Sequence, residues 1–377
     1  MGDLKTTNDR KRITHLDTCR GIAATMVVAS HCLQTVDVDR TWNALRVALG
    51  HYPVLFFFVL SGYVLGKPLT RRKIDLRFYA AYAVRRFFRL IPLLAGVFLF
   101  AFFVAKWLDS ARVGNLGISE WAVNLATWMA QVATPSQLWE NLLLVQRGLN
   151  VPTWTIKIEI VCSMMLPAVA LLVSSNRFLT VAALAGFCFF GSRQFTGLFG
   201  LDSSDMTLFE SSRYMYLFLL GFLLCRFDGF FSDQRKGAAL VLLLVLMGAL
   251  VLTLWFPWGD DVSHGLVMAG ILAVLIPLPF PAVKKILEAR VPVLFGDLSY
   301  GIYLFHTPVL LLLIAGPVTP WFGGGGGAAR FPVLFFQVFL LTLVFSFLAN
   351  RCLELPLNRL GHILASGITG RKRQLFS

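Results

Sequence analysis

The sequence predicts an all-α integral membrane protein with about ten transmembrane helices around a polar interior. Of its 377 residues, 57% are hydrophobic and only 14% are charged, whereas soluble chains are about 45–50% apolar and about 25% charged. The mean hydropathy is +0.71, and apolar stretches long enough to cross or nearly cross a bilayer recur along the whole chain. This composition excludes an ordinary soluble domain and a disordered chain.

Ten apolar stretches are candidate spans. They lie at 14–33, 52–66, 90–108, 154–173, 178–190, 214–227, 238–256, 265–281, 294–315 and 331–349. The longest piece between spans is 109–153. Its stretch WAVNLATWMAQV (121–132) predicts a helix at the membrane surface, where Trp side chains are enriched.

The Lys and Arg residues predict the orientation of these spans. With the N-terminus inside, 24 of the 34 fall in inside segments and 8 in outside segments, while Arg20 and Lys157 lie within spans. Cytoplasmic loops carry an excess of basic residues, so we expect both termini inside, an N-in/C-in topology. The net charge of +14 then reflects topology, and we expect no nucleic acid partner.

We expect a single membrane domain at 14–360, between a cytoplasmic tail at 1–13 and a basic cytoplasmic tail at 361–377. We expect no cleavable signal sequence, because no short apolar stretch with a small-residue cleavage site follows the basic N-terminal segment. The glycine run 323–327 follows no predicted strand and precedes no Lys-Ser or Lys-Thr pair, so a flexible connector is expected there. The six cysteines lack metal-ligand spacing, and we expect neither a metal site nor disulfides.

The first span carries Asp17, Arg20 and His31, ionisable residues that are costly in a membrane and usually mark a functional interior. Arg20 and His31 are eleven residues apart, so they share one helix face at a separation of about 16 Å along the axis. Asp17 lies on the same stripe and can pair with Arg20. The spacing alone leaves two interpretations open, a structural ion pair with a core histidine or a functional site.

Six motifs follow one another in a characteristic order. They are Arg20 and His31 after Leu16-Asp17, PVLFFFVLSGYVLG (53–66), RRFFRLIP (85–92), VPTWTIKIEI (151–160), FGDLSYGIYLFHTPV (295–309) and LELP (353–356). In this order they resemble the motifs of the acyltransferase 3 family, multi-pass membrane proteins that O-acylate carbohydrates and some other acceptors. The resemblance covers about 13–360, with departures from the family pattern at Leu55, Thr155 and Lys157.

The resemblance implies a membrane O-acyltransferase. Its donor would be cytosolic acyl-CoA, expected to be acetyl-CoA, used as a co-substrate with no permanently bound cofactor. Its acceptor would be a hydroxyl of a surface polysaccharide, lipopolysaccharide or lipid-linked sugar. His31 is the expected general base, because an imidazole titrates near neutral pH. A bacterial inner membrane is the expected location.

The same resemblance implies roles for other polar residues. Glu159, in the fourth span, would be catalytic by orienting His31, or would bind the acceptor, although a structural ion pair explains it equally well. Arg20, Arg86 and Arg89 would bind the phosphates of CoA, because planar guanidinium groups suit phosphate. Anchoring to anionic lipid also explains the basic cluster around Arg86 and Arg89.

Two further features concern helix faces. Ser299, Tyr303 and His306 are spaced four and three residues apart, so they form one helical stripe. This stripe would supply hydrogen-bond donors to the reaction, or hold helices together. Ser61-Gly62 in the second span predicts a close approach of two helices.

Two other functions remain as alternatives. A transporter or flippase for a lipid-linked sugar or small metabolite also has many spans and intramembrane charges, but it predicts repeated halves. The ionisable residues instead concentrate in the first, fourth and ninth spans. An inactive partner of a polysaccharide-synthesis complex would keep the motifs without the chemistry. The expected partners are therefore acyl-CoA, a hydroxyl acceptor and the lipid bilayer.

Overall fold

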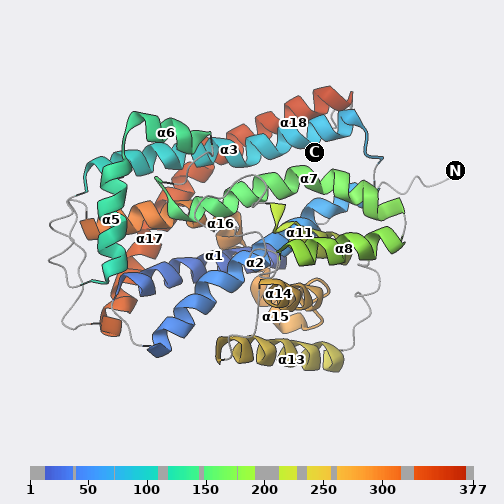
Figure 1. Ribbon diagram of the computed structural model, residues 1–377, viewed down its shortest axis with the longest axis horizontal. Coiled ribbons are helices and arrows are strands. Elements are labelled where there is room, and N and C mark those ends of the chain that lie inside the picture. Colours follow the sequence, from blue (N-terminus) through green and yellow to red (C-terminus); the bar gives the residue numbers. More distant parts are fainter. Residues whose placement is uncertain are drawn as a thin grey trace.

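The protein is all-helical wherever the structure describes it (Figure 1). The computed structural model describes residues 13–36, 40–71, 73–108, 118–143, 148–175, 177–191, 212–226, 236–255, 261–315 and 327–370. Residues 1–12 of the predicted N-terminal tail, positions 323–326 of the glycine run and residues 371–377 of the basic tail lie outside these ranges.

Each of the ten predicted spans overlaps a helix, although residues 276–280 of the eighth span follow the end of its helix. These helices are α1 (Thr14–Thr35), α2 (Arg40–Arg71), α3 (Leu76–Lys106), α7 (Trp154–Ser175), α8 (Arg177–Gly191), α11 (Met215–Arg226), α13 (Lys236–Trp255), α14 (Asp261–Leu275), α16 (Arg290–Ala315) and α17 (Phe331–Ala349). The shorter or peripheral helices are α5 (Glu120–Val132), α6 (Pro135–Leu142), α15 (Pro281–Leu287) and α18 (Leu355–Thr369). A 3₁₀ turn covers Val151–Thr153, and a π-helical turn covers Asn350–Glu354.

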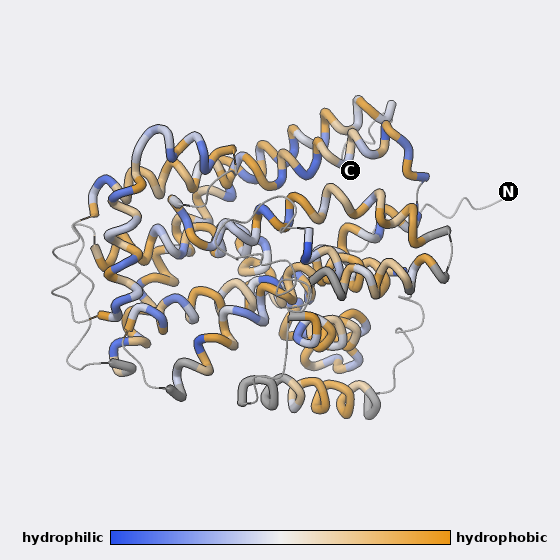
Figure 2. Tube along the Cα trace, in the orientation of Figure 1, coloured by the Kyte–Doolittle hydropathy of each residue, from blue (hydrophilic) through white to orange (hydrophobic). Residues whose placement is uncertain are grey.

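Among the described residues, five helical stretches are long and apolar enough to cross a membrane. They are Ala44–Arg71, Leu76–Lys106, Val151–Val173, Arg290–Ala315 and Phe331–Thr369. Hydrophobic residues predominate along these helices, and polar ones interrupt them near the centre of the molecule (Figure 2). Large apolar side chains such as Phe103, Val241 and Phe336 are exposed on the outside, as expected of a membrane protein.

Several helices extend beyond the predicted spans. α2 begins at Arg40 and α3 at Leu76, both well before the apolar stretches that predicted them. Hydropathy detects only the part of a helix that suits hydrocarbon, whereas backbone hydrogen bonding continues into the polar flank. The Asp75 carboxylate caps α3 by accepting a 2.7 Å hydrogen bond from the N–H of Phe78. Arg46, expected in a loop, therefore lies on α2.

The centre of the molecule is formed by α1, which packs between α2 and α16 (Figure 1). α1 and α16 run parallel and nearly touch at two glycines. A Cβ atom on Gly21 would lie 2.7 Å from the carbonyl carbon of Phe295, and one on Gly296 would lie 2.4 Å from that of Asp17. Only a residue without a side chain permits this approach.

A second close approach joins α2 to α11, again in parallel. A Cβ atom on Gly62 would lie 2.1 Å from the carbonyl oxygen of Phe218, and one on Gly221 would lie 1.9 Å from that of Val59. The structure thus confirms the packing role that Ser61-Gly62 predicts.

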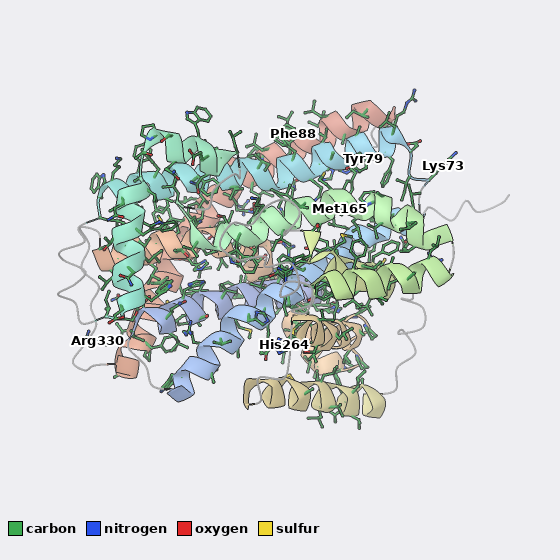
Figure 3. The ribbon with its side chains drawn as sticks, in the orientation of Figure 1. Lys73, Tyr79, Phe88, Met165, His264 and Arg330 are labelled. Atoms are coloured by element: carbon green, nitrogen blue, oxygen red, sulfur yellow. The ribbon has the colours of Figure 1, made fainter. Side chains whose placement is uncertain are left out.

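The side of the molecule at the top of Figure 1 consists of α3 with α18 alongside it and α7 next to them. α18 continues past residue 360, the predicted end of the membrane domain, to Thr369. The Tyr79 and Tyr82 hydroxyls on α3 donate to the carbonyls of Met164 and Ser163 on α7, at 3.0 and 2.8 Å. Figure 3 shows Tyr79 on α3 and Met165 on the neighbouring α7.

The predicted surface segment 121–132 is indeed a helix, α5. Its N-terminus is attached to the end of α1 through Ser119, whose N–H donates to the Thr35 carbonyl at 2.9 Å and whose hydroxyl donates to the Gln34 carbonyl at 2.5 Å. α5 therefore brings Trp121 to the end of α1.

We expect Gly221→Ala to lower stability, because the new methyl group overlaps the backbone of α2. Overpacking of this kind costs about 1–3 kcal/mol. Thermal unfolding in detergent measures the change. Gly248→Ala on α13 is the matched control, because a Cβ there meets no atom within 4 Å, and it should be neutral or stabilising. Equal melting temperatures for the two variants would contradict the close α2–α11 contact.

Candidate functional site

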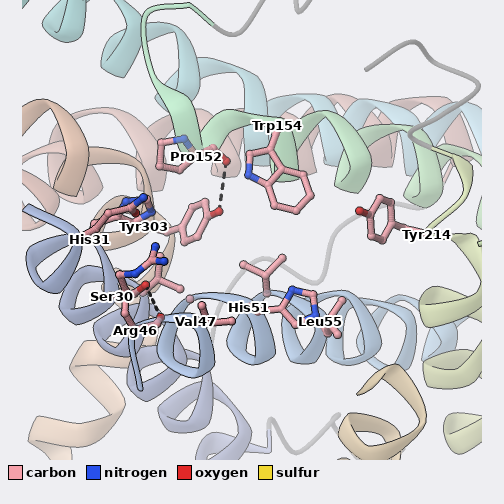
Figure 4. A pocket seen from close by; sticks show the side chains of 14 residues that line it. Ser30, His31, Arg46, Val47, His51, Leu55, Pro152, Trp154, Tyr214 and Tyr303 are labelled. Atoms are coloured by element: carbon pink, nitrogen blue, oxygen red, sulfur yellow. Dashed lines mark hydrogen bonds between the residues drawn. The ribbon is translucent and has the colours of Figure 1, made fainter. Parts of the chain in front are cut away.

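A cavity of about 360 Å³, here called the histidine cavity, lies among α1, α2, α7 and α16. Its lining residues are Val27, Ser30, His31, Gln34, Arg46, Val47, Gly50, His51, Val54, Leu55, Pro152, Trp154, Tyr214 and Tyr303. In Figure 4, His31 and Tyr303 lie at one end, while Trp154 and Tyr214 lie farther along. The walls combine aromatic rings with a few polar groups, the usual composition of a small-molecule site.

His31 lies near the C-terminal end of α1, beside aromatic side chains from two other helices. Its ring centroid is 5.7 Å from that of Trp121 on α5 and 5.0 Å from that of His306 on α16. With its amide oxygen facing the donors, Gln34 accepts from Trp121 Nε1 at 3.0 Å and from Arg46 at 3.3 Å. Three helices thus determine the environment of His31.

The predicted stripe on α16 faces the interior, and its three members Ser299, Tyr303 and His306 are all buried. Thr155 donates to the Tyr303 hydroxyl at 2.9 Å, and Tyr303 donates to the Pro152 carbonyl at 3.2 Å. His306 Nδ1 lies 2.6 Å from the carbonyl oxygen of Tyr303. Ser299 Oγ is buried and has no hydrogen-bond partner among the described residues.

A second, smaller cavity of about 130 Å³, the arginine cavity, lies toward the start of α1. Its lining residues are Arg20, Leu60, Ser61, Val64, Leu65, Arg86, Arg89, Leu90, Glu159 and Tyr300. Arg86 donates to Glu159 at 2.7 Å and to Ser163 Oγ at 3.3 Å.

The other two arginines of this cavity also face carboxylates. Arg89 pairs with Glu354, and Arg20 lies 3.9 Å from Asp17, the pair that the helix spacing predicts. Each buried charge therefore has an opposite charge nearby, as a low-dielectric site requires. The Arg20–Asp17 pair is the longest of the three, and the Arg20 side chain is 31% exposed. Arg20 is thus the arginine most available to an incoming anion.

The structure divides the predicted site residues into two groups. Arg20, Arg86, Arg89 and Glu159 line the arginine cavity, with Asp17 paired to Arg20. His31 and Tyr303 line the histidine cavity, and His306 contacts both. Glu159 bonds to Arg86 and lies 3.5 Å from the Ser61 hydroxyl, so its role in orienting His31 remains a prediction with no contact that supports it.

Other residues of the two cavities were not predicted from the sequence. In the histidine cavity, Gln34, His51 and Tyr214 carry no motif that would identify them. Glu354 lies within LELP, but its pairing with Arg89 depends on contact between α3 and the π-helical turn. Among the described residues, no group of three or more His, Cys, Asp or Glu could hold a metal ion.

A further ion pair lies at the start of α1. His15 is buried, with Nδ1 3.2 Å from Glu288 and Nε2 3.0 Å from the Leu275 carbonyl. The hydrogen bond from His15 lowers the pKa of Glu288 below its usual range. Because the folded-state pKa is lowered, this pair contributes stability above the unfolded-state pKa of Glu288 and loses it as the pH falls through the folded-state value.

Comparison with known proteins gives two findings. The family model described as "Acyltransferase domain", of the acyltransferase 3 type, matches residues 13–351. The "O-acetyl transferase" of Shigella phage Sf6 is 23% identical over 309 residues, which cover 79% of this chain and 85% of that protein. No solved structure is significantly similar to the chain.

We expect Glu354→Ala to be strongly destabilising, because it leaves Arg89 without its buried carboxylate. Removal of one partner from a buried ion pair costs about 3–5 kcal/mol. Thermal unfolding in detergent checks this expectation. Glu288→Ala is the matched control, because that carboxylate is 36% exposed, and partly exposed pairs contribute about 1 kcal/mol or less. A loss no larger than that of the control would contradict the structural role of Glu354.

Proposed function

The chain belongs to the acyltransferase 3 family, and from this premise we propose that it transfers an acetyl group from acetyl-CoA to a hydroxyl of a carbohydrate. Family membership makes the protein an acyltransferase and favours this reaction over transport. The phage relative named as an O-acetyl transferase supports an acetyl donor and an oxygen acceptor. The observation that carries the proposal is the position of His31 on the wall of a cavity that can admit one sugar unit.

His31 is the general base of the proposed reaction. It removes the proton of the acceptor hydroxyl while the oxygen attacks the thioester carbonyl, and the new C–O bond forms as the C–S bond breaks. The imidazolium then returns the proton to the departing thiolate. The Tyr303 hydroxyl is the donor we assign to the oxyanion, and its proton must turn away from the Pro152 carbonyl to reach it.

The arginine cavity is the proposed site of the CoA phosphates. Arg20 and His31 lie on the same helix, about 16 Å apart along its axis, so an extended donor with phosphate at one end and thioester at the other can reach both. The exposed Arg71, Lys73 and Arg77 at the end of α2 and the start of α3 add positive charge beyond the balanced pairs.

The directions of the packed helices support the alternation of the ten proposed spans, and the distribution of Lys and Arg supports the N-in/C-in orientation. Contacts make α1 parallel to α16, and α2 parallel to α11, whereas Tyr82–Ser163 and Arg86–Glu159 make α3 antiparallel to α7. This is the pattern expected when odd spans run outward and even spans run inward. The arginine cavity is then on the cytosolic side, where CoA is available, and the histidine cavity lies nearer the outer face of the proposed bacterial inner membrane.

We propose a carbohydrate as the acceptor because aromatic rings form part of the wall of the histidine cavity. The rings of Trp154 and Tyr214 lie 6.1 Å apart and tilted by 53°. The negative face of an aromatic ring suits the weakly positive C–H groups of a sugar ring. The volume of about 360 Å³ admits one monosaccharide unit of a glycan or lipid-linked sugar rather than several.

We expect His31→Ala to lower the rate of acetyl transfer by about 10²–10⁴-fold, the usual contribution of a general base. Inside-out vesicles that contain the protein receive labelled acetyl-CoA, and both CoA release and label in the lipid and glycan fractions are measured. His362→Ala on the exposed face of α18 is the control and should retain full activity. An active His31→Ala protein would remove His31 from the mechanism.

We expect Arg20→Gln to raise KM for acetyl-CoA by about ten- to hundredfold, because a hydrogen bond to a charged group contributes about 1.5–3 kcal/mol. The same vesicles should show no such increase with acetyl-pantetheine, a donor that lacks the nucleotide phosphates. Equal effects on both donors would mean that Arg20 does not bind phosphate.

A further inference from the structure

His306 is a buried residue for which the proposed reaction has no defined use. Its side chain is only 1% exposed and lies on the α16 face that contacts α1. Among the described residues, none forms a hydrogen bond with His306 Nε2 or with His31 Nδ1, although both atoms are buried. Two unsatisfied nitrogens in neighbouring rings are costly, so the pair requires an explanation.

The contacts of His306 determine its tautomer. Nδ1 lies 2.6 Å from the carbonyl oxygen of Tyr303, which can only accept. Nδ1 therefore carries the proton, and in the neutral ring Nε2 carries a lone pair. His306 Nε2 is thus an acceptor and cannot donate a hydrogen bond to an oxyanion or a sugar.

The two rings are at the separation of a hydrogen-bonded pair. Their centroids are 5.0 Å apart, with planes tilted by 43°. Two imidazoles joined by an N–H···N bond of about 2.9 Å have centroids roughly 5 Å apart. A hydrogen bond between them requires the His31 ring to turn until its Nδ1 faces His306 Nε2, while His306 Nδ1 stays on the Tyr303 carbonyl.

We propose that His306 is a positioning residue that accepts the Nδ1 proton of His31 and so directs His31 Nε2, with its lone pair, to the acceptor hydroxyl. This inference rests on the proposed acyl transfer. His306 has the role that the carboxylate has in a catalytic triad, because it fixes the tautomer and the orientation of the base.

The proton balance follows from these tautomers. The acceptor hydroxyl transfers its proton to His31 Nε2 as its oxygen bonds to the acyl carbon, and the resulting imidazolium keeps its Nδ1 proton bonded to His306. When the C–S bond breaks, Nε2 returns the proton to the thiolate. His306 keeps its own proton on Nδ1 throughout, bonded to the Tyr303 carbonyl. The residues that line the histidine cavity include no carboxylate, so the neutral imidazole of His306 takes the place that a carboxylate has in a triad.

Two amide variants separate this role from a structural one. In His306→Gln the amide reaches the position of Nε2, so its oxygen can accept from His31. In His306→Asn the amide occupies the position of Nδ1, so it can keep the bond to the Tyr303 carbonyl but cannot reach His31. We expect the Asn variant to lose about 10² in kcat and the Gln variant to stay within about tenfold of wild type, both with unchanged KM for acetyl-CoA.

The measurements are acetyl transfer in the vesicles described above and thermal unfolding of each variant. An active Asn variant with an inactive Gln variant would show that His306 only stabilises α16 and would overturn the proposal. Equal activity of the two variants would overturn it as well. Wild type and His31→Ala, measured together with them, test acyl transfer itself. Loss of the proposed function is therefore distinguishable from loss of this inference.

A second measurement does not depend on the folding of the variants. Histidine ¹⁵N chemical shifts of the wild-type protein in detergent distinguish the two neutral tautomers, and His31→Ala identifies the His31 signals. We expect a protonated Nδ1 and an unprotonated Nε2 at His31. The opposite tautomer would overturn the proposal, whatever the activities of the variants.

Discussion

The contact between α1 and α16 is the constraint on which the rest of the site depends. Gly21 and Gly296 let the two backbones touch, and the helices run parallel from that point. His31 is ten residues beyond Gly21, and His306 is ten residues beyond Gly296. Parallel helices with equal rise keep these residues level, so the two rings meet at 5.0 Å. A side chain at either glycine would separate the helices and, with them, the two histidines.

The same helices separate two kinds of chemistry along the molecule. In the arginine cavity, Arg86 and Arg89 each have a buried or half-buried carboxylate partner, which limits the cost of charge within a membrane. The histidine cavity instead is lined by imidazole, hydroxyl and aromatic groups, with Arg46 bonded to Gln34 at its edge. In the proposed reaction, the anionic donor is held at the level of the arginine cavity, and the proton is transferred at the level of the histidine cavity.

The sequence predicted much of this arrangement because hydropathy and helical spacing are local properties. Each apolar stretch became a helix, Asp17 pairs with Arg20, and Ser299, Tyr303 and His306 share a buried face. Helix ends were less predictable, since backbone hydrogen bonding continues where the apolar residues stop. Because α2 begins before its apolar stretch, Arg46 lies on this helix and lines the histidine cavity, although the sequence places it between two spans.

By itself, the sequence determined the helical membrane class, the order of the apolar helices, the family and the helix that carries both Arg20 and His31. Only the tertiary structure decided the partners of each polar residue. It placed Glu159 with Arg86, Glu354 with Arg89, and His306 with His31, across separations of 73 to 275 residues in the chain. Helical periodicity states which direction a side chain points but not which helix lies there. Which helix becomes the neighbour depends on where two backbones can approach closely. For α1 and α16, Gly21 and Gly296 permit that approach.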